Sequence, residues 1–153
     1  NNKKLPEAVT TLGEHFAARG YLTIGATANP NLNAEFGFGQ GYEHYQLGLA
    51  KSWSHALTGR DGVDAALATL SEQKQAGDDR PFLVRLMLLD THAPRHAKQA
   101  VWTPYQDAGI PARVAQYRAH ARQMDDALAA FDSGGAGPYK SRNENRRKRC
   151  PQP

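Results

Sequence analysis

The side chains best placed to do chemistry in this sequence are Asp90 and His92, in the segment DTHAP at residues 90–94. They follow residues 82–89, an apolar run typical of a buried strand. Ligands of open α/β sheets bind beyond the carboxyl ends of strands, and an imidazole there can donate a hydrogen bond to an anionic oxygen. His92 is therefore a candidate anion-binding residue. The alternative is that it only hydrogen-bonds its own loop.

The DTHAP segment would lie at the carboxyl edge of a sheet if helices and strands alternate along the chain, as in α/β folds. A helix over residues 6–19 leads through Gly20 into a strand, which is the αβ step of an α/β sheet. The later apolar run is continuous rather than alternating, which favours a parallel strand covered on both faces. We expect an α/β fold with a partial, mostly parallel sheet flanked by helices. The further predicted elements are a strand at 21–24, a helix at 62–76 and a helix at 112–131.

Apolar residues at helical spacing predict which helix faces are buried. The segment FGFGQGYEHY at residues 36–45 is rich in glycine and aromatic residues and is predicted to be a loop. In the first helix the predicted face is Leu5, Val9, Leu12 and Phe16, and in the last it is Val114, Tyr117, Ala121, Met124, Leu128 and Phe131.

The composition limits the possible classes of protein. A chain of 153 residues with 40% apolar and 22% charged residues fits one globular domain. No apolar run approaches the roughly 20 residues of a membrane-spanning helix. No signal peptide is expected, because the chain begins NNKK without an apolar segment; the initial Asn suggests a processed chain or a fragment. One cysteine, Cys150, excludes an intrachain disulfide and a cysteine-based zinc cluster, and nothing indicates a compartment.

The positive charge is concentrated near the carboxyl terminus. Residues 139–150 hold six basic side chains and one acidic one, whereas the rest of the chain holds 13 basic and 14 acidic residues. The body is thus close to neutral, which excludes interpreting the whole chain as a basic nucleic-acid binder.

Four blocks, in order, are similar to segments of the sulfatases of the alkaline-phosphatase superfamily. Residues 80–84, RPFLV, and the DTHAP segment resemble the family's R-P-F-F-L and D-x-H-x-P. The other blocks are TLGEHF with GYLT at 11–23, GFGQGYEHY at 37–45, and Tyr117 with MDDAL at 124–128. Together the blocks cover about residues 5–131.

The resemblance implies a substrate role for His92. In the family the matching histidine contacts the sulfate or phosphate of the substrate. His96 and Lys98 would add positive charge near the same anion, although the family's Tyr after the proline is Arg95 here. The family mechanism uses a formylglycine that attacks sulfate beside a calcium ion, with serine or threonine in phosphatase relatives.

The rest of the family's active site is not found in these residues. There is no C/S-x-P-S-R nucleophile motif, no paired N-terminal aspartates, no Lys-x-His pair after the first strand and no S-D-H-G segment. We interpret Asp125 and Asp126 as surface residues of a helix, because adjacent helical residues point about 100° apart. No catalytic or metal-binding residue is therefore assigned. Calcium is expected only in the intact parent.

These observations predict a fragment of a sulfatase-like hydrolase, inactive alone, whose intact parent cleaves sulfate esters. A phosphatase or phosphonate ester hydrolase parent is the close alternative. Residues 1–131 would form the partial α/β domain, which is expected to aggregate or to need a partner. Residues 132–153 would form a flexible basic tail, disordered or frameshifted. In a second alternative, residues 140–149 bind nucleic acid or an anionic membrane surface.

Overall fold

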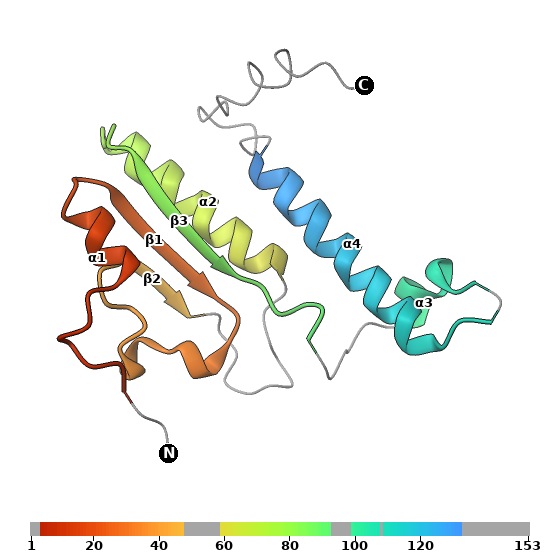
Figure 1. Ribbon diagram of the computed structural model, residues 1–153. Helices are drawn as coiled ribbons and strands as arrows, with labels where there is room; N and C mark the ends of the chain where they lie inside the picture. The colour runs from red at the N-terminus through yellow and green to blue at the C-terminus, as the bar shows by residue number, and fades with distance from the viewer. Residues whose placement is uncertain (1–3, 48–58, 93–98, 108, 133–153) are drawn as a thin grey trace, which may run out of the picture.

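The computed structural model describes residues 4–47, 59–92, 99–107 and 109–132. Within these ranges a three-stranded sheet has the strand order β2-β1-β3 and is flanked by helices (Figure 1). β1 (Leu22–Thr27) is central and pairs in parallel with β2 (His44–Leu47) and with β3 (Phe82–Met87). The predicted α/β fold with a partial parallel sheet is confirmed.

The main core lies between β1 and helix α2 (Gly59–Gln75). All six residues of β1 are buried. Leu22 and Ile24 of β1 pack against Ala66 and Leu70 of α2, and Phe82, Val84, Leu86 and Phe131 border this cluster. Alternate β1 residues face α2, so Thr23, Gly25 and Thr27 face the other side of the sheet.

Helix α1 (Leu12–Ala17) is shorter than predicted. It begins at a capping box, in which Glu14 N–H donates to the Thr11 hydroxyl and Thr11 N–H donates to the Glu14 carboxylate. The start predicted at residue 6 is wrong because residues 6–9 form a turn, closed by a bond from Val9 N–H to the Pro6 carbonyl at 3.0 Å, and the helix begins only after its cap at Thr11. The predicted apolar face is wrong in part, since Val9 and Leu12 are about half exposed.

The predicted loop at 36–45 ends in a strand that the sequence did not suggest. Two short 3-10 helices, Pro30–Leu32 and Ala34–Phe36, precede it. Gly37 and Gly41 then turn the chain with φ values of 85° and 82°. The glycines that favoured a loop thus belong to the turns that lead into β2.

β3 is less covered than predicted. It ends at Met87, and all six of its residues are half-buried, whereas β1 alone is buried throughout. The prediction that this strand is covered on both faces is wrong for the described chain, because only one helix of the described chain, α2, packs against β3 with more than marginal contact. α2 packs on one face of β3, and no described helix lies over the other (Figure 1).

Helix α4 (Ala112–Asp132) has the predicted span but a different buried face. Ala115, Ala119 and Ala127 are buried, and small side chains there let α4 lie close to α2. Two residues of the predicted face, Tyr117 and Leu128, are 49% and 43% exposed. α3 (Gln99–Trp102), which was not predicted, lies with the start of α4 away from the sheet (Figure 1).

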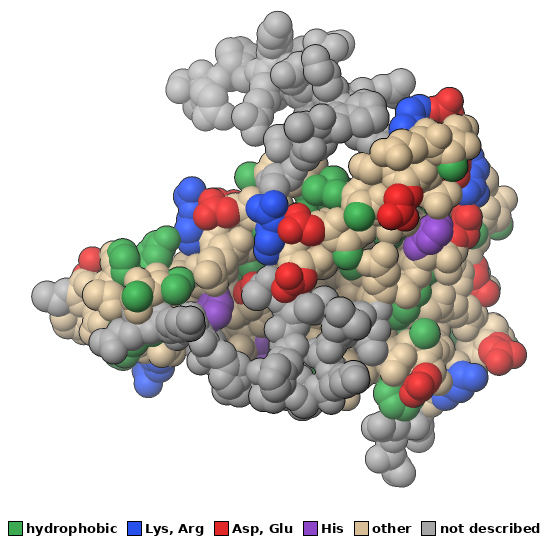
Figure 2. All heavy atoms as spheres, turned by 180° about the vertical axis from the view of Figure 1, so that it is seen from behind, with side chains coloured by type: hydrophobic (Ala, Val, Ile, Leu, Met, Phe, Trp, Pro, Cys, Tyr) green, Lys and Arg blue, Asp and Glu red, His purple; other side chains and the backbone are tan. Residues whose placement is uncertain are grey.

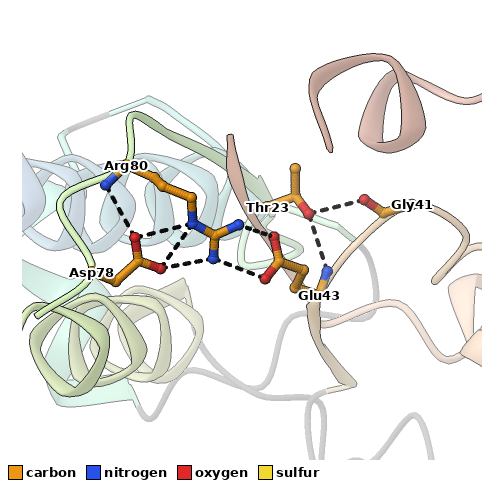
Figure 3. A network of polar contacts seen from close by, with 5 residues as sticks. All are labelled: Thr23, Gly41, Glu43, Asp78 and Arg80. Carbon is orange, nitrogen blue, oxygen red and sulfur yellow. Dashed lines mark hydrogen bonds and ion pairs between the residues drawn. The ribbon is translucent and has the colours of Figure 1, made fainter. Parts of the chain in front are cut away.

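A polar network joins the amino ends of the three strands (Figure 3). The buried Thr23 hydroxyl donates to the Gly41 carbonyl and accepts from Glu43 N–H, at 2.9 and 3.0 Å. The Glu43 carboxylate pairs with Arg80, which also holds Asp78. The network fixes the strand ends opposite to the edge that carries His92.

Two sequence predictions fall mainly on other parts of the chain. The basic segment at 140–149 and the tail from residue 133 lie outside the described residues. No helix among the described residues is long and apolar enough to cross a membrane.

Candidate substrate-anion site

His92 lies just past the carboxyl end of β3, as predicted. The ladder between β1 and β3 extends one step further through a bond from Ala28 N–H to the Met87 carbonyl. His92 N–H then donates to the Leu89 carbonyl at 2.8 Å, which closes a turn. The His92 side chain is exposed on this turn. The backbone bond does not distinguish the anion-binding role from the loop-bonding alternative, because both concern the imidazole; the role of His92 stays a prediction.

Asp90 fixes the turn to the start of α2. Its carboxylate accepts from Gly59 N–H at 2.9 Å through one oxygen and at 2.7 Å through the other. A carboxylate is favoured at this place because the first N–H groups of a helix lack partners inside the helix. A Cβ at Gly59 would lie 2.8 Å from Asp90 Oδ2, so a larger residue there would require the carboxylate to shift. Asp90 therefore positions the segment that carries His92.

Sequence reasoning missed this contact because its two residues are 31 positions apart. The predicted helix began at residue 62, after Gly59. An acidic residue at a strand end and a glycine ahead of a predicted helix were the available signals.

The neighbouring end of β1 is also held by side-chain bonds. Asn29 N–H donates to the Thr27 hydroxyl at 3.1 Å, and Asn31 N–H donates to Asn29 Oδ1 at 2.9 Å. The second bond caps the 3-10 helix at Pro30–Leu32. The carboxyl edge of the sheet thus carries two fixed turns, one after β1 and one after β3.

A hollow of about 230 Å³ lies beside Asp90, between the start of α2 and α4. Its lining residues are Arg60, Asp90, Gln123, Asp126 and Ala127. The charged groups at its rim have partners of their own: Arg60 pairs with Asp64 at 2.8 Å on the same helix. His92 is not among the lining residues.

Asp125 and Asp126 are exposed on α4, as predicted. Arg122 pairs with Asp126 at 2.9 Å and approaches Asp125 at 3.9 Å. Among the residues that the structure describes, no three or more His, Cys, Asp or Glu side chains are grouped to hold a metal ion. These residues do not fit the calcium site that the family resemblance implies for the intact parent.

His96 and Lys98, together with Arg95, lie outside the described residues. Their expected contribution to the anion site stays a prediction. On the face seen in Figure 2, basic side chains lie beside acidic ones, so that face has no single-sign field.

Comparison with known proteins identifies the fold and the family. A family profile described as Sulfatase matches residues 1–132. No curated protein matches the chain.

Two solved structures share the fold. An alkaline-phosphatase-superfamily protein from Vibrio parahaemolyticus has a TM-score of 0.53 at 18% identity, over 82% of this chain and 34% of its own. The lipoteichoic acid synthase LtaP from Listeria monocytogenes has a TM-score of 0.53 at 16% identity, over 78% of this chain and 31% of its own. The chain spans about a third of the length of these structures. The four motif blocks, the parallel sheet and the profile match agree: the chain belongs to the sulfatase family.

Proposed function

We propose that this chain supplies the substrate-anion contact of a sulfatase-type ester hydrolase, with His92 as the contacting residue. The observation that supports this proposal is the position of His92, exposed on a closed turn at the carboxyl end of β3. That edge is where open α/β sheets bind their ligands.

The imidazole suits a sulfate ester in either protonation state. Neutral imidazole has one N–H donor and imidazolium has two, and the ester carries non-bridging oxygens that accept. The bonds between Asp90 and Gly59 would hold the turn while the ligand binds. A phosphate ester presents similar acceptors, so the geometry serves a phosphatase or phosphonate ester hydrolase equally well.

We further propose that the chain does not hydrolyse esters by itself. Its 153 residues contain no C/S-x-P-S-R segment to form formylglycine, and the described residues do not fit calcium. Without a nucleophile and a cation, the charge that develops in the transition state has no stabiliser. In this proposal both come from parts of the sulfatase domain that this sequence lacks.

Ligand binding tests the role of His92. An aryl sulfate ester is titrated into the full chain while the backbone amide signal of Gly59, which is bound to Asp90, is followed by NMR. His92→Ala should weaken binding at least about tenfold, because a hydrogen bond to a charged group contributes roughly 1.5–3 kcal/mol. His15→Ala, at an exposed position on α1, is the matched control. Equal affinities of the wild type and His92→Ala would exclude the proposed contact.

An assay of ester hydrolysis tests the proposal that the chain is inactive by itself. The full chain with calcium should release no product from aryl sulfate or aryl phosphate esters. Calcium-dependent release that disappears in His92→Ala would contradict the proposed inactivity while supporting the role of His92. The ester that is hydrolysed faster, aryl sulfate or aryl phosphate, would then distinguish a sulfatase from a phosphatase.

A further inference from the structure

Arg85 lies in a row with Gly25 and Tyr45 across the three strands. The register pairs Gly25 with Tyr45 on β2 and with Arg85 on β3. Paired residues of a sheet point to the same face, and this row belongs to the face opposite α2. The half-buried Arg85 side chain therefore lies on the face of β3 that no described helix covers (Figure 1).

The absence of a side chain at Gly25 makes room for two tyrosine rings. A Cβ at Gly25 would lie 2.6 Å from a carbon of the Tyr45 ring and 3.3 Å from a carbon of the Tyr42 ring. The two ring centroids are 5.7 Å apart. Both rings thus pack over the central strand, next to the position of Arg85.

The phenol groups of both tyrosines are close to the guanidinium. Burial raises the pKa of Tyr42 and of Tyr45, and the charge and hydrogen bonding of Arg85 act in the opposite direction on each pKa. Tyr45 donates its hydroxyl hydrogen to the Leu32 carbonyl at 2.5 Å, so only its oxygen lone pairs face Arg85. No acceptor among the described residues takes the Tyr42 hydroxyl hydrogen.

The charge of Arg85 has no counter-charge in the described part of the chain. Its neighbours on β1 and β2 are phenols and a glycine, and no described carboxylate pairs with it. Arg80 and Arg122, in contrast, each hold carboxylates. A guanidinium has five N–H donors, and two phenol oxygens can occupy only some of them. A partly buried cation in such a setting is stabilised when an anion completes its surroundings.

We propose that Arg85 and Tyr42 form an anion-binding site on the open face of β3. The ligand is an oxyanion: a sulfate or phosphate group, or a carboxylate. Arg85 would supply paired N–H donors and the positive charge, and Tyr42 would donate its hydroxyl hydrogen to the same ligand. Tyr45 would hold the guanidinium in place. This site is additional to the one built around His92, and it does not depend on ester hydrolysis.

Titrations of the full chain with sodium sulfate, sodium phosphate and sodium acetate test the site, at an ionic strength kept constant with chloride. The readouts are the NMR signals of the Gly25 amide and the Arg85 Nε–H. We expect a saturable shift that is absent from Arg85→Met, at least tenfold weaker in Tyr42→Phe and unchanged in His92→Ala. Arg113→Met, at an exposed position on α4, is the control for charge. Saturation by sulfate and phosphate alone would identify a tetrahedral group, and saturation by acetate would identify a carboxylate.

A thermal melt gives a second readout that also shows whether the variants fold. Arg85→Met should melt higher than the wild type in anion-poor buffer, because it removes an uncompensated charge. The titrated anion should raise the melting temperature of the wild type but not that of Arg85→Met. A wild-type response no larger than that to chloride, or equal responses in wild type, Arg85→Met and Tyr42→Phe, would overturn the proposal.

Discussion

Arg80 holds Glu43 with both arms of its guanidinium, Nη1 to Oε1 at 2.9 Å and Nη2 to Oε2 at 3.0 Å. Glu43 directly precedes β2 and Arg80 lies just ahead of β3, so this ion pair spans the central strand β1. Both residues belong to the family-like blocks, GFGQGYEHY and RPFLV. These two family-like residues therefore connect the ends of strands and stabilise the fold, and we assign them no role in substrate binding.

Removing the ion pair between Arg80 and Glu43 should destabilise the domain. Arg80→Ala is expected to lower the urea midpoint without changing the m-value, because the change acts on the folded state. Arg80→Lys should recover only part of the loss, since an ammonium group cannot form the two parallel bonds. Arg113→Ala, at an exposed position, is the control. Equal midpoints for Arg80→Ala and Arg113→Ala would show that the exposed pair contributes nothing.

The Thr23 hydroxyl should contribute measurably to the stability of the domain. Thr23 is 0% exposed and bonds to the Gly41 carbonyl and to Glu43 N–H. Thr23→Val keeps the shape but leaves both backbone groups without this partner, which should cost about 1–3 kcal/mol in the free energy of unfolding. Thr10→Val, at an exposed position, should cost little. Urea unfolding followed by circular dichroism measures both.

Two glycines with similar backbone angles give a matched pair. Gly20 and Gly41 have φ values of 75° and 82°. A Cβ at Gly20 meets nothing within 4 Å, whereas one at Gly41 would overlap the backbone nitrogen of Glu14. Gly20→Ala should cost about 1–2 kcal/mol for its left-handed backbone alone. Gly41→Ala should cost clearly more, because α1 must also move away; similar losses in thermal melts would contradict this close packing.

Most helices and strands could be predicted from local sequence patterns, but the faces that they bury could not. The apolar runs and helical periodicities located β1, β3, α2 and α4. β2 was missed because four residues after a glycine-rich turn carry too little pattern. The buried face of α4 was missed because alanines such as Ala119 give a weaker apolar signal than Tyr117 and Leu128, although their small side chains let α4 lie close to α2.

For the site, the position of His92 followed from the strand that precedes it. The contacts that fix it did not, because they join distant parts of the chain. Asp90 reaches Gly59 from 31 residues away, and only the fold reveals that pairing. In the sequence, Arg85 only interrupts an apolar strand. Its proposed role in anion binding depends on Tyr45 of β2 and on Tyr42 of the preceding loop, which only the fold brings close to it.

Acid should unfold the domain through two carboxylates. The backbone N–H of Thr11 and the side chain of Gln40 lower the pKa of Glu14, and hydrogen bonds from Arg80 lower the pKa of Asp78. A pKa lowered in the folded state adds stability above the unfolded value, about 4 for both, and this stability is lost as pH falls through the folded pKa.

Melting temperatures between pH 6 and pH 2 test this expectation. The wild type should lose stability below about pH 4, and the loss should be shallower in Glu14→Gln. Glu35→Gln, at an exposed position, should keep the wild-type profile. A Glu14→Gln profile parallel to that of the wild type would show that the capping box does not depend on ionisation.

The apolar side chains left exposed on α4 should make the chain self-associate. Tyr117 and Leu128 are 49% and 43% exposed, and they lie about three turns apart on the same side of α4. Exposed apolar side chains that lie together favour association, because association removes them from water. The double variant Tyr117→Gln, Leu128→Gln should reduce association in sedimentation velocity without lowering the melting temperature. Ala119→Gln, at a buried position, should instead lower it, and a wild type that stays monomeric at high concentration would show that these side chains do not drive association.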